Sequence, residues 1–312
     1  PDYFGFRLTG NKLSEYTNGS TTQLVNPDTF QWDKELIRKL GYPEDIFLPL
    51  QMPGTKVGQL LPEIQKEVGF DLEVVLCGSH DTASAVMAVP QTEGDGIYIS
   101  SGTWSLMGIE SLKPVITEDA AAANFTNEGG YDHRFRFLKN IMGLWMIQSV
   151  RHEYSDAYSF AQLCDMAEES KEFPSRVDVN DQSFLSPDSM VEAIRQYCHK
   201  TGQPVPESVG ELTSVVYRSL AQSYGETVRG LEKIAGKTYD SIHIIGGGSN
   251  AAYLNQLTAD ATRKTVYAGP GEATAIGNLL AQMIHAGDLT DLKSARKCVR
   301  ESFEIKTFAP AK

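Results

Sequence analysis

The sequence predicts an α/β protein with two domains. Asp71 to Cys77 is a short apolar run rich in β-branched residues, and a loop separates it from the small residues of Thr82 to Val89, so that strand, loop and helix come in succession. Between Ser241 and His285, two more units of strand, glycine-containing loop and helix follow one another. Such units are typical of α/β domains, and a length of 312 residues allows two domains.

The first domain is expected to span residues 1–89 and the second residues 90–312. The boundary falls in the polar stretch Pro90 to Gly96, which contains glycine and proline. Near the start of the first domain, an aromatic run from Asp2 to Leu8 leads into a turn at residues 9–11.

The second domain is expected to begin with extended segments. Ile97 to Ser100 and Trp104 to Ile109 are predicted strands of a hairpin whose tip is Ser101-Gly102-Thr103. Asn127 to Leu138 is predicted to be a second extended segment, and Asn140 is expected to be the N-cap of a helix that ends at about Glu153.

The clearest long helix is predicted over Glu211 to Ala235, where apolar residues recur at helical spacing before Gly236 ends it. The two strand, loop and helix units follow. Their predicted parts are a strand at Ser241 to Ile245, a loop at Gly246 to Gly248, a helix at Asn250 to Thr262, a strand at Thr265 to Ala268, a loop at Gly269 to Gly271 and a helix at Ala273 to His285.

Composition and charge argue against several classes of protein. With 41% hydrophobic residues the chain can bury a sizeable core, whereas its longest apolar stretches, such as Ile141 to Ile147, are too short to span a membrane. The four cysteines and six histidines show no metal-ligand spacing, so reduced thiols and no protein-bound structural metal are expected. A net charge of −12 argues against a nucleic-acid partner. With no secretory signal in the sequence, a cytoplasmic protein is expected.

Three loops can supply the chemistry of an active site. They are Gly78 to Asp81, Ser101 to Thr103 and Gly246 to Asn250. Ligands of α/β sheets collect beyond the carboxyl ends of strands, where exposed N–H groups favour anions. Glycine-rich loops can hold phosphates and a lone loop aspartate can accept a proton, so the three loops together indicate phosphoryl transfer.

Taken singly, each of these loops also has a purely structural explanation. The three glycines can serve tight packing or positive φ angles, Ser-Gly-Thr can be a simple turn, and Asp81 can cap its helix. A Ser-His-Asp hydrolase built from Ser79, His80 and Asp81 is set aside, because adjacent residues cannot form a triad and G-x-S-x-G is absent. Trp104 and Trp145 are expected to lie in the core rather than to contact a sugar.

At these loops the chain resembles the FGGY carbohydrate kinases, which have the actin and hexokinase-like (ribonuclease H-like) two-domain fold, and the resemblance runs over essentially the whole chain. The motifs that carry it are Asp2-Tyr3-Phe4, Leu8-Thr9-Gly10, Glu15-Tyr16-Thr17-Asn18, Thr21-Thr22-Gln23-Leu24-Val25-Asn26, Ser79-His80-Asp81-Thr82-Ala83-Ser84-Ala85-Val86, Ser100-Ser101-Gly102-Thr103-Trp104-Ser105-Leu106-Met107-Gly108, Thr126-Asn127-Glu128-Gly129-Gly130 and Leu138-Lys139-Asn140-Ile141-Met142-Gly143-Leu144-Trp145.

The resemblance implies roles for individual residues. Asp81 matches the catalytic base. His80, Thr82 and Asn140 match sugar-binding positions, and Asp81 matches a sugar-binding position as well. The positions that match nucleotide contacts are Thr103, Gln148 and Gly247.

The resemblance further implies that Mg-ATP phosphorylates a small sugar, with L-rhamnulose as the expected substrate and no protein residue expected to ligate the metal. A kinase for another ketose or polyol, and a non-catalytic actin-like nucleotide-binding module, are the alternatives. Family members begin with a hairpin that forms the first phosphate loop, and nothing like it precedes Pro1. An N-terminal segment of the same polypeptide is therefore expected to be missing, and the chain alone is expected to be inactive.

Overall fold

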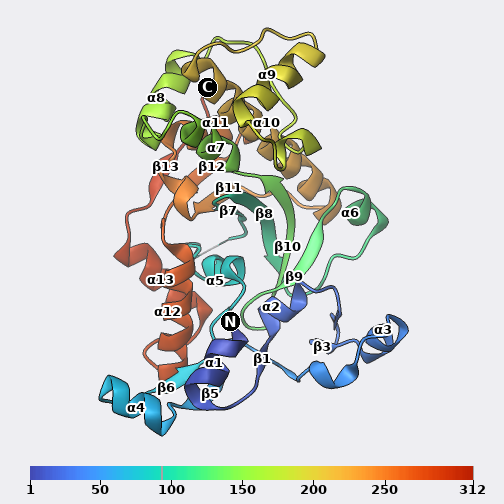
Figure 1. The fold of residues 1–312 in the computed structure, drawn as a ribbon, viewed down its shortest axis with the longest axis vertical. Helices are drawn as coiled ribbons and strands as arrows, with labels where there is room; N and C mark the ends of the chain where they lie inside the picture. Colours follow the sequence, from blue (N-terminus) through green and yellow to red (C-terminus); the bar gives the residue numbers. More distant parts are fainter. Residues whose placement is uncertain (93, 312) are drawn as a thin grey trace.

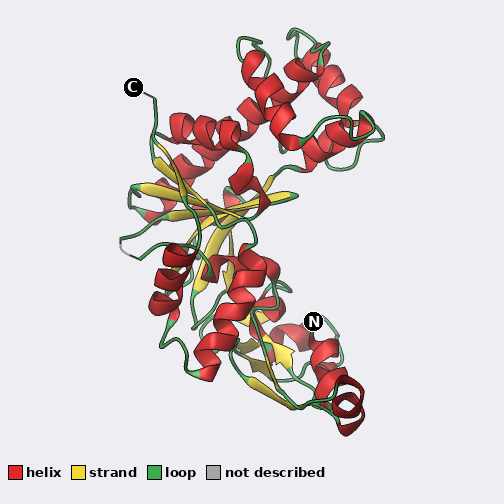
Figure 2. Cartoon of the chain, turned by 90° about the vertical axis from the view of Figure 1, so that its left-hand side faces the viewer, coloured by secondary structure: helices red, strands yellow, loops and turns green. Residues whose placement is uncertain are grey.

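A seven-stranded mixed sheet is the centre of the molecule. The computed structural model describes residues 1–92 and 94–311, and Figure 2 shows helices on both sides of this sheet. Its strands, in spatial order, are β13 (Lys306–Phe308), β12 (Thr265–Ala268), β11 (Ser241–Ile245), β7 (Ile97–Ser101), β8 (Trp104–Ser111), β10 (Phe135–Met142) and β9 (Thr126–Gly129).

Strand direction divides the sheet into two parts. β12, β11 and β7 are parallel, with Ile244 opposite both Ala268 and Ile99, and the remaining neighbours pair antiparallel. Three successive parallel strands place their carboxyl ends at one edge of the sheet. The loops that follow β7, β11 and β12 therefore lie on the same side of the molecule.

Helices cover one face of the sheet and form the larger core. They are α7 (Trp145–Glu153), α8 (Phe160–Glu169), α9 (Met190–Lys200), α10 (Val209–Ala235) and α11 (Ala252–Thr262). Ile97 and Ile99 point to this face. α10 begins with a capping box between Ser208 and Glu211 and ends at Gly236, which is left-handed with φ 63°. Among the described residues, no helix combines the length and the apolar character that crossing a bilayer requires.

The opposite face of the sheet packs against three helices, which are α5 (Asp81–Met87), α12 (Ala273–Ala286) and α13 (Leu292–Ser302). Tyr98 points to this face because side chains alternate along a strand. α5 and α12 approach closely, since a Cβ atom added to Gly277 would lie 1.8 Å from the carbonyl oxygen of Ser84. The Ser84 hydroxyl also donates a hydrogen bond of 2.7 Å to the carbonyl oxygen of Thr274. This contact holds the start of α5 beside the main sheet.

Residues 1–80 form small elements around three two-stranded sheets, at the bottom of Figure 1. The elements are α1 (Asp2–Thr9), β1 (Ser14–Glu15), α2 (Tyr16–Ser20), β2 (Val25–Asn26), β3 (Gln31–Trp32), α3 (Lys34–Lys39), η1 (Glu44–Ile46), β4 (Leu50–Gln51), β5 (Lys56–Gln59), α4 (Pro62–Val68) and β6 (Glu73–Val75). The short elements elsewhere are α6 (Glu118–Ala122), η2 (Gln182–Phe184) and η3 (Gly247–Asn250).

A buried carboxylate fixes the loop before α5. Glu15 is 1% exposed, and it caps α2 by accepting hydrogen bonds from the N–H groups of Thr17 and Asn18. The same carboxylate accepts bonds from the Ser79 N–H at 3.2 Å and the Ser79 hydroxyl at 2.6 Å. Because a buried carboxylate is tolerated only when its lone pairs are satisfied, this cluster holds residue 79 in one position.

Most of the predicted elements are present. The predicted hairpin is formed by β7 and β8, the strands at 241–245 and 265–268 have the predicted bounds, and α10 ends where Gly236 was predicted to end it. The strand predicted over Asp71 to Cys77 is shorter, at Glu73–Val75.

Two predictions of local structure were wrong. The predicted extended segment 127–138 is a hairpin of β9 and β10. Asn140 lies inside β10, opposite Leu106 of β8, and not at a helix N-cap; the helix begins at Trp145. Asparagine favours caps through its own side chain, and here the cross-strand pairing with β8 overrides that local preference.

The contact between α5 and α12 generates the first prediction. Gly277→Ala should lower the free energy of unfolding by about 1–3 kcal/mol, because the new methyl group would overlap the Ser84 backbone and the helices would have to separate. Urea titration followed by circular dichroism measures this change. Gly230→Ala in α10 is the matched control. A Cβ at Gly230 would meet only an ordinary contact of 3.9 Å, so the change there should be under about 1 kcal/mol. Equal effects of the two substitutions would contradict the proposed close contact.

Candidate active site

One pocket lies where the loops after the parallel strands meet the start of α5. Its volume is about 560 Å³. The residues that line it are His80, Asp81, Thr82, Ser100, Ser101, Gly102, Thr103, Trp104, Leu106, Asn140, Gly246, Gly247, Gly271, Glu272 and Thr274. Six of the seven candidate residues are therefore brought together, from segments up to 167 residues apart in the sequence (247 − 80). The sheet topology explains this, since ligands of α/β sheets bind at the carboxyl ends of strands.

Asp81 is the first residue of α5, and its side chain is 78% exposed in the pocket. Its Oδ1 atom accepts hydrogen bonds from the Thr82 N–H at 2.6 Å and the Thr82 hydroxyl at 3.2 Å. No hydrogen bond to Oδ2 is formed by the described residues. Thr82 thus orients the carboxylate and leaves one oxygen available to a ligand.

The hairpin tip is held by the start of the next helix. The N–H groups of Leu144 and Trp145 donate to the carbonyl oxygens of Gly102 and Thr103, at 3.0 and 3.1 Å. Gly143 allows this approach, because a Cβ there would lie 2.5 Å from the carbonyl carbon of Trp104. The tip is therefore fixed, and Thr103 is exposed to the pocket.

The three consecutive glycines have different roles. Gly246 has a φ of 83°, in the region that glycine favours. A Cβ at Gly248 would lie 1.9 Å from the Ser101 hydroxyl oxygen, so Gly248 is needed for packing against the end of β7. Gly247 has neither constraint, since its φ is ordinary and a Cβ would meet nothing within 4 Å. Backbone conformation thus explains Gly246 and packing explains Gly248, whereas Gly247 faces the pocket without a structural need for glycine.

The last two candidate residues are placed differently. Asn140 is exposed on β10 and lines the pocket. Gln148 is half-buried on α7, and the structure does not bring it to the wall of this pocket.

His80 is tied to a buried ion pair behind the pocket. Nη2 of Arg136 lies 3.1 Å from Nδ1 of His80 and 3.0 Å from Oε2 of Glu128. Burial is the largest effect on the His80 pKa and holds it below its usual value of 6.5, and the positive charge of Arg136 lowers it further. The carboxylates of Glu128 and Asp81 act in the opposite direction. His80 is therefore neutral at physiological pH.

Sequence reasoning missed several residues of this pocket, among them Glu272, Thr274 and Trp104. Glu272 and Thr274 lie at the start of α12, and the Thr274 hydroxyl donates to the backbone oxygen of Asp81 at 3.3 Å. The Gly269 to Gly271 loop after β12 was the available signal, because it repeats the pattern of the loop after β11. Trp104 was expected in the core. Instead it is 42% exposed and lines the pocket, and Trp145 is 36% exposed, because Trp104 begins β8 directly after the hairpin tip and Trp145 begins α7 beside that tip, so that neither lies on a covered strand face.

The residues that could meet a metal ion are few. The described residues contain no cluster of three or more His, Cys, Asp and Glu side chains placed to hold one. The pocket has two carboxylates, Asp81 and Glu272, and no Lys or Arg among the described residues that line it. This set suits an ion held mainly by the ligand's phosphates, as Mg²⁺ commonly is.

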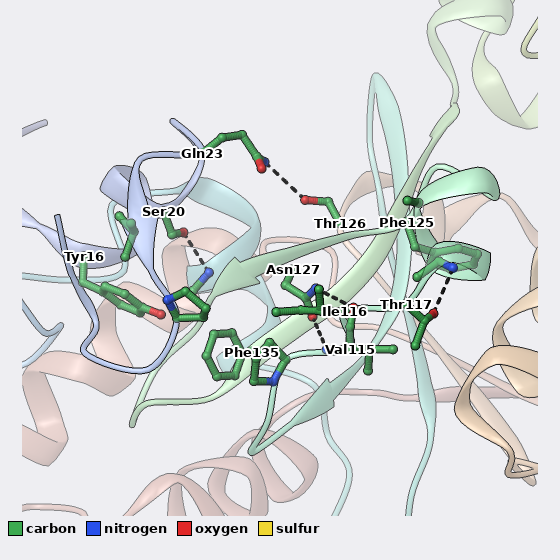
Figure 3. Close-up of a pocket in the computed structure, with 16 residues that line it drawn as sticks. Tyr16, Ser20, Gln23, Val115, Ile116, Thr117, Phe125, Thr126, Asn127 and Phe135 are labelled. Carbon is green, nitrogen blue, oxygen red and sulfur yellow. Dashed lines mark hydrogen bonds between the residues drawn. The ribbon is translucent and has the colours of Figure 1, made fainter. Parts of the chain in front are cut away.

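A second pocket, of about 300 Å³, lies between the α2 region and the strand β9 (Figure 3). Tyr16 and Phe135 line it together with Val115 and Ile116. The Ser20 hydroxyl accepts a hydrogen bond of 2.7 Å from the Gly129 N–H, which joins the two parts across this pocket. None of the candidate residues lines it.

Two models of one protein family match the chain. Residues 1–88 match the N-terminal domain model of the FGGY family of carbohydrate kinases, and residues 97–286 match the C-terminal domain model.

Curated relatives are similar over the whole chain. The chain is 52% identical over 311 residues to a protein named rhamnulokinase from Halalkalibacterium halodurans, covering 100% of this chain and 66% of that protein. It is 50% identical over 309 residues to a rhamnulokinase from Oceanobacillus iheyensis, covering 99% and 65%. For a rhamnulokinase from Bacillus subtilis the identity is 46% over 313 residues, covering 99% and 64%. The chain thus spans slightly less than two thirds of the length of these relatives.

Solved structures show the same fold at low sequence identity. A xylulose kinase from Rhodospirillum rubrum superposes with a TM-score of 0.70 at 15% identity, covering 99% of this chain and 62% of that one. A glycerol kinase from Plasmodium falciparum with ADP gives a TM-score of 0.73 at 15% identity, covering 99% and 61%. The predicted actin and hexokinase-like fold of the sugar kinases is confirmed. With both of its domain models matched, the chain belongs to the FGGY family of carbohydrate kinases.

Proposed function

We propose that the protein to which this chain belongs transfers the γ-phosphoryl group of ATP to the O1 hydroxyl of L-rhamnulose, as a step of rhamnose metabolism. The observation that carries the proposal is the single pocket in which Asp81, His80, Thr82 and Asn140 are brought together with Thr103 and the glycine loop, Gly246 to Gly248. The relatives named rhamnulokinase, 46–52% identical over essentially the whole chain, support the choice of sugar.

Asp81 is proposed as the catalytic base. Its Oδ2 atom would accept the proton of the sugar O1 hydroxyl while Thr82 holds Oδ1. The O1 lone pair then forms the new bond to the γ-phosphorus, the bond between that phosphorus and the bridging oxygen breaks, and ADP leaves. The protein's part in such a transfer is mainly to position the reactants and to stabilise charge.

The two sides of the pocket are proposed to bind different reactants. The sugar would be contacted by His80, Asp81, Thr82 and Asn140. Sugar binding is thereby assigned to residues 1–89, together with Asn140 from the second domain. Thr103 and Gly247 would contact the nucleotide, as part of a nucleotide-binding domain over residues 90–312. Gln148 keeps its assignment to the nucleotide only from the family resemblance, because it lies outside this pocket.

Mg²⁺ is proposed to accompany ATP. It would be held by the phosphates, with Asp81 or Glu272 nearby, and would offset phosphate charge. The need for such an ion follows from the pocket wall, whose described residues offer carboxylates but no Lys or Arg. Backbone N–H groups of the glycine loop would supply further anion contacts. A cytoplasmic location remains a prediction.

The base assignment leads to a prediction for the complete polypeptide that contains this chain. Asp81→Asn should lower kcat by about 10²- to 10⁴-fold, because an amide cannot accept the hydroxyl proton. A coupled assay of ADP release measures the change, and calorimetric titration with ADP should show nucleotide binding retained. Asp240→Asn, on an exposed loop before β11, is the control and should leave kcat unchanged. Near-normal turnover of the Asp81 variant would reject Asp81 as the base.

The glycine loop allows a separate prediction for nucleotide binding. Gly247→Ala should weaken ADP binding by roughly tenfold, since the added methyl group would enter the pocket without straining the fold. Calorimetry on the same polypeptide gives Kd, and thermal unfolding should be nearly unchanged. Gly248→Ala should instead lower Tm, because its methyl group would overlap Ser101. Unchanged ADP affinity in the Gly247 variant would remove that residue from the nucleotide site.

The choice of sugar is tested by a substrate panel. ADP release with Mg-ATP should be highest with L-rhamnulose when L-fuculose, D-xylulose and glycerol are offered at the same concentration. Preference for another sugar or polyol would keep the chemistry and replace the substrate. If the complete polypeptide turned over none of them, a non-catalytic nucleotide-binding module would be the better description.

A further inference from the structure

Arg136 is a fully buried arginine in contact with a residue of the pocket. It lies on β10 directly opposite Glu128 of β9, and its side chain is 0% exposed. Nη2 forms the ion pair with Glu128, and Nε donates a hydrogen bond of 3.0 Å to the carbonyl oxygen of Gly129. A buried guanidinium is costly unless it is paired, and the pairing explains how β9 and β10 accommodate it. It does not explain why a charge is placed behind His80.

The contact with His80 restricts where the imidazole proton can be. A guanidinium only donates hydrogen bonds and keeps its charge at all ordinary pH values. Nδ1 of His80, at 3.1 Å from Arg136 Nη2, must therefore present a lone pair. The proton of the neutral ring is then on Nε2. Glu128 Oε2 lies farther from Nδ1, at 3.9 Å, so Arg136 is the nearer partner.

Nε2 of His80 is the ring nitrogen that approaches Asp81. Nε2 lies 4.0 Å from Oδ1 of Asp81, too far for a hydrogen bond. Among the described residues no side chain or carbonyl group forms a hydrogen bond with Nε2, and the ring lines the pocket. A donor is thus directed at the space beside the carboxylate that is proposed to take the sugar proton.

We propose that Arg136 is a positioning residue that holds His80 in the Nε2–H tautomer, so that His80 donates a hydrogen bond to a hydroxyl or carbonyl oxygen of the sugar. This inference rests on the proposed function for the identity of the ligand, but not for the tautomer. A neutral His80 also leaves Asp81 free to act as a base, because an imidazolium 4.0 Å away would stabilise the carboxylate and make it a weaker proton acceptor.

Three secondary-structure elements supply the charged groups around the His80 ring. Arg136 comes from β10, Glu128 from β9, and Asp81 from α5, beside His80 itself. The Arg136 charge has a larger effect on the His80 pKa than that of Glu128, and it acts to lower it. Replacing both members of the ion pair should therefore move the titration of His80 to higher pH.

The tautomer can be read directly by ¹⁵N NMR of the 312-residue chain labelled at histidine, with the His80 signals assigned from their loss in His80→Gln. The expected spectrum has Nε2 protonated and Nδ1 unprotonated at neutral pH. In Arg136→Met/Glu128→Gln, which removes both charges of the pair, a fraction of Nδ1–H tautomer should appear, and the ring should titrate at higher pH. Glu128→Gln alone is the matched control and should keep the Nε2–H form.

A wild-type ring with its proton on Nδ1, or one that exchanges freely between tautomers, would overturn the proposal without relying on any variant.

The role of the donor is tested by kinetics of the complete polypeptide. The double variant should lower kcat/KM for the sugar about tenfold, the typical effect of one lost hydrogen bond, and should shift the acidic limb of the pH profile to higher pH. His80→Gln keeps an N–H donor near the Nε2 position and should retain more activity than His80→Leu. Equal kcat/KM for wild type and His80→Leu would refute the donor role. Absence of sugar turnover by the wild type would refute the proposed function, whereas the NMR result would still decide the tautomer.

Discussion

Parallel pairing of β7, β11 and β12 is the constraint on which the site depends. Because the three strands run in the same direction and are adjacent, their carboxyl ends lie at one edge, and the loops that follow them must share one side of the sheet. The hairpin tip, the glycine loop and the start of α12 are neighbours for this reason. None of the three loops contains a complete site, and a different strand order would separate them.

Two further contacts bring Asp81 to this edge. α5 packs on α12 so closely that Gly277 has no room for a side chain beside Ser84. The carboxylate of Glu15 holds Ser79 from the other side, through its N–H and hydroxyl groups. The residue that carries the base thus lies between the small sheets of the first part of the chain and the main sheet. Loss of either contact would displace the Asp81 carboxylate, and a small displacement of a catalytic group lowers the reaction rate substantially.

Buried charge is concentrated around the pocket. Glu15, Glu128 and Arg136 are all buried, and each contacts the loop or the ring that borders Asp81. Apolar residues of similar volume commonly serve stability as well or better than a buried ion pair. Stability therefore does not account for these charges, whereas orientation of Ser79 and His80 does. The same reasoning separates Gly247, which no packing contact requires, from Gly248, which packing against Ser101 requires.

The sequence by itself determined the local elements and the chemistry of the loops. Apolar periodicity and glycine stops predicted α10, the β7–β8 hairpin and the two strand, loop and helix units, because these signals act over a few residues. It could not place Asn140 in a strand or Trp104 in the pocket, since both depend on pairing with distant segments. Glu272, Thr274 and the contact between Arg136 and His80 were likewise decided only by the tertiary structure. A side chain's neighbours across a sheet are set by strand order and register, which no short stretch of sequence encodes.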